Sequence, residues 1–401
     1  MRPSFTSPID GDPYRSRPQG QLRGVFATNV SLTLWPARFR LHAINFLNLL
    51  LISVPVTFWL EFNHASDTLI FGAACLAILP LAGLIGSATE QLAARTGSTI
   101  GGLLNATFGN ATELIIAFFA LSAGKFDVVK ASITGSIIGS LLLVLGLAMF
   151  LGGLRYPRQT FNAHAAQVTA SLLTISVIAF MVPALFDFTE RSFGIAPADV
   201  RVDDTHLALG VSVVLIALYA ANILFSLVTH HDLLSEADGE HEHGKLWSPV
   251  LALGVLLGAT VLVGFMSEVL VGSLEGFTAD FGLSEFFVGL IIIPIVGNAA
   301  EHAAAVVFAM RNKMGLAVTI ALGSTTQVAL LVAPLLVILS FVIGKPMDLV
   351  LNNQLELVAL IGAVLIANSV ARDGETNWLE GFMLLGVYLI LGIAFFFLPS
   401  V

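Results

Sequence analysis

Long apolar runs separated by short polar segments follow one another along most of this 401-residue chain. Each is close to the length of about 20 residues that an α-helix needs to cross a bilayer. Eleven runs can be bracketed: 41–60, 68–87, 98–122, 127–153, 163–186, 207–230, 248–270, 284–310, 315–342, 354–370 and 378–398. Because lipid cannot hydrogen-bond to exposed backbone groups, the pattern predicts an all-α membrane protein with eleven transmembrane helices.

Composition agrees with a lipid environment. The chain is 56% hydrophobic and 11% charged, with a mean hydropathy of +0.90, whereas soluble domains are about one-quarter charged. The single cysteine, Cys75, excludes a disulfide framework and a thiolate metal site. The basic residues are scattered over the loops, so nucleic acid is not a predicted partner.

Lysine and arginine positions predict the orientation. If the polar tail 1–40 is cytoplasmic, thirteen basic residues lie on the cytoplasmic side and five on the other. This bias predicts a cytoplasmic N-terminus and a C-terminus on the opposite side of the membrane. The short tail favours a prokaryotic inner membrane, and a vacuolar membrane is the alternative.

Two segments of the chain repeat each other at a fixed spacing. GNATELIIAFFA at 109–120 matches GNAAEHAAAVVFA at 297–309, so that Glu113 corresponds to Glu301 at an offset of 188 residues. In the next run of each half, Gly135 and Ser136 correspond at the same offset to Gly323 and Ser324. Five crossings per copy would invert the second copy relative to the first, a common plan of secondary transporters.

The repeat predicts how the chain is divided. A cytoplasmic polar tail (1–40) is followed by an extra N-terminal helix (41–60). The first five-helix repeat covers 61–228, and the second covers 248–401. The cytoplasmic linker 229–247, rich in acids and histidines, joins them.

A carboxylate inside a bilayer is costly, so Glu113 and Glu301 must either hold protons or meet a cation. Gly109 and Gly297 lie one turn before the two acids and permit close helix approach or an exposed carbonyl. Pro294 frees a further carbonyl in the second copy. With the hydroxyls of Ser136 and Ser324, these groups form an oxygen-only ligand set suited to a hard cation such as Ca²⁺.

The same arrangement predicts exchange. Two carboxylates balance one Ca²⁺, and two protons neutralise the empty pair, because burial and mutual repulsion favour the protonated acids. The site can change from facing one side of the membrane to facing the other when it holds Ca²⁺ or two protons, whereas the bare dianion cannot. Coupling of Ca²⁺ to H⁺ follows from this penalty.

These motifs resemble the signature regions of the calcium/proton exchanger (CAX) family, within the cation/calcium exchanger superfamily. The resemblance covers about residues 41–400 and is carried by GGLLNATFGNATELI from Gly101, by GNAAEH and by GSTTQVALLVAP from Gly323. It implies transport of Ca²⁺ with H⁺ as counter-ion, with no cofactor. It implies that Glu113 and Glu301 bind the cation and that Gly109 and Gly297 contribute backbone oxygens. Around them it places Asn110, Asn298, Ser136, Ser324 and Gln327, and on the proton or cation path Glu90 and His302. The chain departs from the family at Gly139, where an asparagine is common.

Four residues have a second interpretation beside a role on this path. Glu90 is either an interfacial acid or part of a vestibule. Glu268 stands at the comparable end of the seventh run and has the same two interpretations on the outer side of the membrane. His302 points about 100° away from Glu301 around a helix, as a packing residue or a proton relay. Asn105, like Gln327, either serves the site or bonds neighbouring helices.

The linker carries five acids: Asp232, Glu236, Asp238, Glu240 and Glu242. They predict either a solvated loop or a regulatory segment that concentrates divalent cations. The CAX resemblance supports regulation, and the neighbouring histidines leave Zn²⁺ open as another ligand.

Other classes of protein fit less well. No hydrolase, nucleotide-binding or metalloprotease motif occurs in the polar segments, so an enzyme is not predicted. A cation channel would also use acids, but usually as a ring drawn from several subunits. The main alternative is a Na⁺(K⁺)/Ca²⁺ or Na⁺/H⁺ exchanger of the same superfamily.

Overall fold

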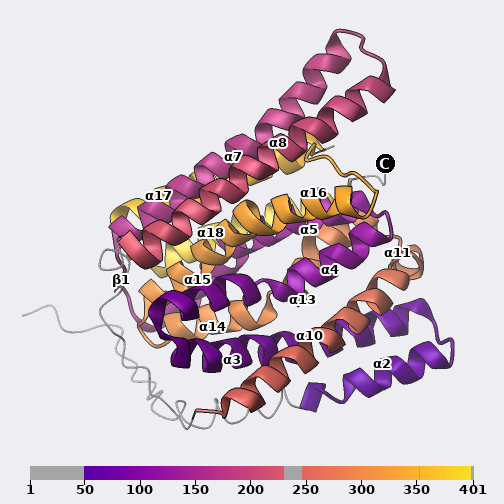
Figure 1. The fold of residues 1–401 in the computed structure, drawn as a ribbon. Helices are drawn as coiled ribbons and strands as arrows, with labels where there is room; N and C mark the ends of the chain where they lie inside the picture. Colours follow the sequence, from indigo (N-terminus) through magenta and orange to yellow (C-terminus); the bar gives the residue numbers. More distant parts are fainter. Residues whose placement is uncertain (1–48, 230–245, 352, 399–401) are drawn as a thin grey trace, which may run out of the picture. The chain divides into compact units, whose positions relative to one another are not determined.

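The computed structural model describes residues 49–229, 246–351 and 353–398. Within these ranges the chain is almost entirely helical, which confirms the all-α prediction (Figure 1). The polar tail 1–40 and the five linker acids lie outside the described residues. One two-stranded antiparallel sheet is present in the described part, where β1 (Gln159–Thr160) pairs with β2 (Glu375–Thr376).

The helices of the first half begin with a short element and continue through long spans. They are α2 (Ser53–Phe62), α3 (Asp67–Phe108), α4 (Ala111–Ser122), α5 (Phe126–Ile138), α6 (Leu145–Arg155), α7 (Ala163–Ser192) and α8 (Pro197–Leu224). A π-helical turn, Gly139–Val144, joins α5 to α6, and a second one, Phe225–Thr229, continues α8.

The second half contains more breaks. Its helices are α10 (Pro249–Gly272), α11 (Leu274–Phe281), α12 (Glu285–Phe287), α13 (Ile293–Gly297), α14 (Ala299–Ala309), α15 (Met314–Gln327), α16 (Ala333–Val342), α17 (Gln354–Asp373) and α18 (Trp378–Phe396). π-helical turns Val288–Ile292 and Val328–Val332 join α12 to α13 and α15 to α16.

Eight helical segments in the described part are long and apolar enough to cross a membrane, and nine if the bent pair Leu274–Phe281 and Glu285–Gly297 is one span. The protein is thus a multi-pass integral membrane protein. The predicted count of eleven is not confirmed, because two predicted runs do not form one continuous helix and a third extends beyond the described residues. Run 41–60 begins before the described residues, run 98–122 is divided between α3 and α4, and run 284–310 is divided among α12, α13 and α14.

The two halves are broken at matching places. π-helical turns follow α5 and α15 at nearly the same point of the repeated motif, since Gly139 and Val328 start them. Such turns inside a helix are frequent at functional sites, because they leave backbone groups out of the regular hydrogen-bond ladder. The breaks therefore mark the middle of both halves as the region to search for a site.

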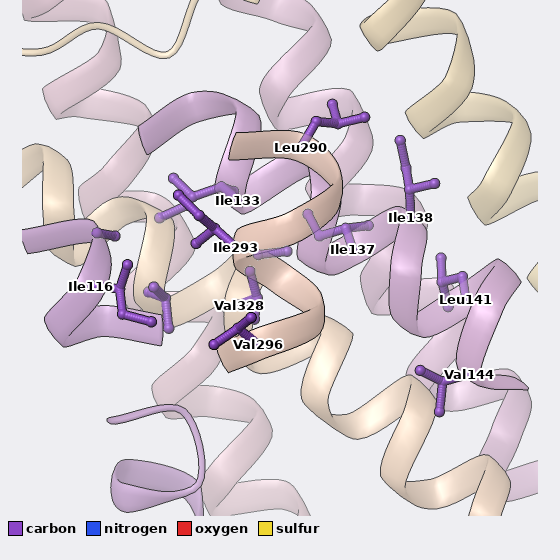
Figure 2. Close-up of a cluster of buried hydrophobic side chains, with 14 of the residues drawn as sticks. Ile116, Ile133, Ile137, Ile138, Leu141, Val144, Leu290, Ile293, Val296 and Val328 are labelled. Atoms are coloured by element: carbon purple, nitrogen blue, oxygen red, sulfur yellow. The ribbon is translucent and has the colours of Figure 1, made fainter. Parts of the chain in front are cut away.

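An apolar cluster drawn from both halves surrounds these breaks (Figure 2). Ile116 of α4, Ile133 and Ile137 of α5, Leu290 and Val296 are all buried in it. Around it, α10 packs along α3, α14 packs against α15 and α6, and α17 packs against α7. Polar groups inside this cluster are held away from water, so their interactions act at low dielectric.

Candidate cation site

Both repeated motifs form a helix break followed by a new helix. Asn110 lies between α3 and α4 with φ −102° and ψ 21°, and Asn298 lies between α13 and α14 with φ −98° and ψ 7°. Glu113 and Glu301 then occupy the first turn of α4 and of α14. The unpaired N–H groups of a first helical turn favour negative charge, so each break places its acid where a carboxylate is best tolerated.

Each acid lies against the break of the other half. A methyl group added to Gly297 would lie 3.3 Å from Glu113 Cγ, and one added to Gly109 would lie 3.6 Å from Glu301 Oε1. Glu113 is only 6% exposed, and its charge interacts with that of Glu301. The two carboxylates thus approach each other across the junction of the halves, in a buried position where their repulsion is poorly screened.

The two asparagines connect the halves in a matching way. Asn110 Nδ2 donates to Gln327 Oε1 of α15. Asn298 Nδ2 donates to Ser136 Oγ of α5 at 3.2 Å and to Pro294 O at 3.1 Å. Because each amide uses its nitrogen to hold a neighbouring element, its oxygen remains available.

Four buried oxygens of these residues have no hydrogen-bond partner in the described part of the chain: Asn110 Oδ1, Glu113 Oε2, Asn298 Oδ1 and Glu301 Oε2. The Ser324 hydroxyl lies beside Glu301. Buried oxygens without a donor are costly, and carboxylate and amide oxygens are ligands of hard cations. The donor set therefore suits a divalent cation such as Ca²⁺ as a transported substrate.

All nine residues predicted to surround the cation belong to this group of acids, asparagines and oxygens or contact it. The predicted path residues are placed differently. Glu90 and Asn105 on α3 and Glu268 on α10 have exposed side chains. His302 follows Glu301, and its Nε2 is buried without a hydrogen-bond partner among the described residues.

The tight packing on one side of the site could not be predicted from the sequence alone. Pro294 has no N–H to donate to Leu290 O, four residues earlier, and this carbonyl lies against Gly135 of α5. A methyl group on Gly135 would be 2.0 Å from Leu290 O. The proline predicts a freed carbonyl, but only the packing of the helices shows which residue lies against it.

The side of the site at Gln327 borders a cavity. A cavity of about 230 Å³ lies between α7, α8 and α15 and reaches Gln327, which holds Asn110. Gly315, Thr319, Gly323 and Gln327 line it at intervals of four residues along one face of α15. No atom lies within 4 Å of a methyl group placed on Gly323, although Gly323 is the counterpart of the tightly packed Gly135. The two halves thus share a motif but differ in packing, and the site borders the cavity at Gln327.

A first prediction follows from the contact between Gly297 and Glu113. Changing Gly297→Ala places a methyl group 3.3 Å from Glu113 Cγ, so the carboxylate must shift. Alanine favours the helix by about 1 kcal/mol relative to glycine, so stability is kept while Ca²⁺ transport falls by about tenfold or more. Uptake of radioactive Ca²⁺ into proteoliposomes measures the effect. The matched control is Gly254→Ala in α10, where the added methyl group meets nothing within 4 Å; equal rates in both variants would contradict the prediction.

Comparison with known proteins identifies the family of this chain. A family model described as sodium/calcium exchanger protein matches residues 66–228 and 251–397. The Ca(2+)/H(+) antiporter of Aphanothece halophytica is 47% identical over 369 residues, covering 88% of this chain and 96% of that protein. The Ca(2+)/H(+) antiporter ChaA of Bacillus subtilis is 44% identical, with 88% and 99% covered.

Solved structures give the same result. The structure of native YfkE matches with a TM-score of 0.75 and 42% identity, covering 88% of this chain and 99% of that one. The H⁺/Ca²⁺ exchanger CAX shares the fold, with a TM-score of 0.67 at 18% identity and coverage of 90% and 92%. The chain therefore belongs to the sodium/calcium exchanger protein family and, within it, to the calcium/proton exchangers (CAX) that its repeated motifs resemble.

Proposed function

We propose that this protein is a secondary antiporter that exchanges Ca²⁺ for protons by alternating access. The observation that carries the proposal is the meeting of Glu113 and Glu301, each against the helix break of the other half. Relatives at 44% and 47% identity are named Ca(2+)/H(+) antiporters, which supports the same substrates here. Transport, and no enzymatic reaction, is the proposed activity.

The mechanism depends on the charge of the buried pair. With both acids ionised, one Ca²⁺ makes the site neutral, and the oxygens of Asn110 and Asn298 supply further ligands. With both acids protonated, the site is neutral without a metal. The dianion alone carries two uncompensated charges in a poorly screened interior, so it does not exchange between the two sides. One Ca²⁺ moving one way is thereby exchanged for protons moving the other way.

The predicted topology is part of this proposal. Eleven crossings, with an extra N-terminal helix at 41–60 and inverted repeats at 61–228 and 248–401, would bring the two motifs in from opposite sides of the membrane. The matching breaks at Asn110 and Asn298 support such a repeat. The N-terminus is proposed to be cytoplasmic, and the acidic linker 229–247 to respond to Ca²⁺ on that side.

The decisive experiment is ion flux in proteoliposomes that contain the purified full-length chain. An imposed proton gradient should drive Ca²⁺ uptake, and Ca²⁺ added without a gradient should drive proton movement in the opposite direction. Uptake that persists when the gradient is collapsed, with no reverse proton flux, would indicate a channel instead. Uptake that follows a Na⁺ gradient would identify a Na⁺/Ca²⁺ exchanger.

The charge balance also predicts a dependence on pH. Because Ca²⁺ and protons compete for the same two carboxylates, the apparent Ca²⁺ affinity weakens as the pH falls. Where both acids are protonated in the absence of Ca²⁺, the apparent dissociation constant rises by up to about 100-fold per pH unit, the limit for two displaced protons. Calorimetric Ca²⁺ titrations of the detergent-solubilised protein over a pH series measure this slope. An affinity that does not change with pH would contradict competition.

A further inference from the structure

A second buried acid lies outside the cation site, at the start of α17. Glu356 is only 2% exposed, and its Oε1 has no hydrogen-bond partner among the described residues. The Asn353 side chain caps this helix by accepting from Leu355 N at 2.9 Å. Capping is thus carried out by Asn353, and the helix does not need the Glu356 carboxylate for this purpose.

The nearest cation is already committed to other groups. Lys130 of α5 is 7% exposed, and its Nζ lies 2.6 Å from Asp348 Oδ1 and 3.0 Å from Val350 O. Asp127 adds a further negative charge that acts on Glu356. If Glu356 were ionised, three carboxylates, those of Asp127, Asp348 and Glu356, would surround the single ammonium group of Lys130. Such a surplus of buried charge costs several kcal/mol, and a proton on Glu356 removes it.

The hydroxyl group of Thr134 lies beside the Glu356 carboxyl. Thr134 Oγ1 also lies 3.0 Å from Lys130 O, to which it can donate. Because a hydroxyl hydrogen rotates, Thr134 can accept from a protonated carboxyl or donate to an ionised one. Thr134 therefore offers a hydrogen bond to both protonation states of Glu356.

Charged groups from the neighbouring helices α7 and α8 interact with Asp348, the partner of Lys130. Arg191 of α7 and Asp204 of α8 interact electrostatically with Asp348. Arg191 is itself paired with Asp187, at 2.7 Å. These groups balance one another around Asp348, and Arg191 is therefore not available to neutralise Glu356. No group of three or more histidine, cysteine or acidic side chains in the described ranges, this cluster included, is arranged to hold a metal ion.

The position of Glu356 separates it from the cavity. β1 precedes α7 and pairs with β2, which follows α17, so the start of α7 and the end of α17 lie at the same end of the bundle (Figure 1). The cavity is lined by the start of α7, including Asn162 and Thr169. Glu356, at the other end of the 20-residue helix α17, lies toward the opposite end of the bundle.

Helix α5 lies against both Glu356 and the cation site. Thr134, beside Glu356, is two residues before Ser136 in α5, and Ser136 accepts from Asn298 at 3.2 Å. We propose that Glu356 is a second proton-binding site, which passes the counter-ion between the cation site and the end of the bundle opposite the cavity. This inference rests on the proposed exchange of Ca²⁺ for protons. The step is a reversible protonation of the Glu356 carboxylate, with Lys130 staying charged throughout.

The test separates proton coupling from the exchange of Ca²⁺ alone. In Glu356→Gln, the neutral amide keeps the shape of the protonated acid but carries no exchangeable proton. Proton-driven Ca²⁺ uptake into proteoliposomes should fall by about fivefold or more, while exchange of internal Ca²⁺ for external radioactive Ca²⁺ stays within about twofold of wild type. Glu356→Asp, which keeps an ionisable group, should restore part of the proton-driven rate.

Different results would overturn different claims. Unchanged proton-driven uptake in Glu356→Gln would exclude the proton site, and equal losses in both assays would show that Glu356 has only a structural role. On the wild-type protein, dicyclohexylcarbodiimide, which modifies protonated carboxyls in apolar surroundings, should label Glu356 in mass spectra; absence of this label would also count against the site. Wild-type protein that shows no proton-driven uptake would instead refute the proposed function itself.

Discussion

Replacing either central acid by glutamine, Glu113→Gln or Glu301→Gln, will reduce Ca²⁺ transport by about 100-fold or more. Glutamine keeps the size of the side chain but removes one negative charge, so Ca²⁺ would leave a net positive charge in a buried site. Breaking a buried charge pair typically costs about 3–5 kcal/mol. The amide also carries no exchangeable proton, so both directions of the exchange are lost. Proton-driven uptake of radioactive Ca²⁺ into proteoliposomes measures the loss.

Two further variants make this result specific. Glu61→Gln removes an exposed acid in α2, and its transport should match the wild-type rate. The double variant of Glu113 and Glu301 should be no slower than either single variant, because the two acids act as one unit and their effects do not add. Near-wild-type transport by either single variant would show that the pair does not carry the cation.

The acids and their partners could be predicted from the sequence because the motif occurs twice. The fixed offset between Glu113 and Glu301 indicates equivalent positions in two halves, and an acid in an apolar run is costly unless it binds a proton or a cation. The glycines one turn earlier are part of the same motif. The structure places Gly109 against Glu301 and Gly297 against Glu113, so each glycine makes room for the acid of the other half.

Other features could not be predicted because they depend on contacts between distant segments. Glu356 and Lys130 have no counterparts in the repeat, since the positions at the same offset are Val168 and Val318. Because the Glu356 and Lys130 pair occurs only once, no internal repeat in the sequence points to it. The π-helical turns are also invisible in the hydropathy pattern, because an apolar run looks the same whether or not its helix is locally widened.

The difference between the two halves is a second case of this kind. Gly135 and Gly323 occupy equivalent places, and sequence alone gives no reason to treat them differently. In the structure one meets the Leu290 carbonyl and the other lies beside the cavity. The asymmetry arises from how α5 and α15 pack, and it leaves a cavity beside α15.

This asymmetry predicts different effects of one substitution at two equivalent glycines. In Gly135→Ala, the new methyl group would lie 2.0 Å from Leu290 O and 2.8 Å from Pro294 Cγ, so α5 must move away from the segment that carries Asn298. Overpacking of this kind costs about 1–3 kcal/mol, and a clash with backbone is at the upper end because no side chain can rotate away. The Asn298 to Ser136 hydrogen bond is lost as the helices separate.

The unfolding temperature of the purified protein should therefore fall in Gly135→Ala, and Ca²⁺ transport should fall by about tenfold or more. Gly323→Ala is the matched control for stability, because its methyl group meets no atom within 4 Å and its unfolding temperature should not decrease. Thermal unfolding followed by tryptophan fluorescence compares the two variants directly. Equal destabilisation by both would mean that the two halves are packed alike, and the closed side of the site would then have no structural basis at Gly135.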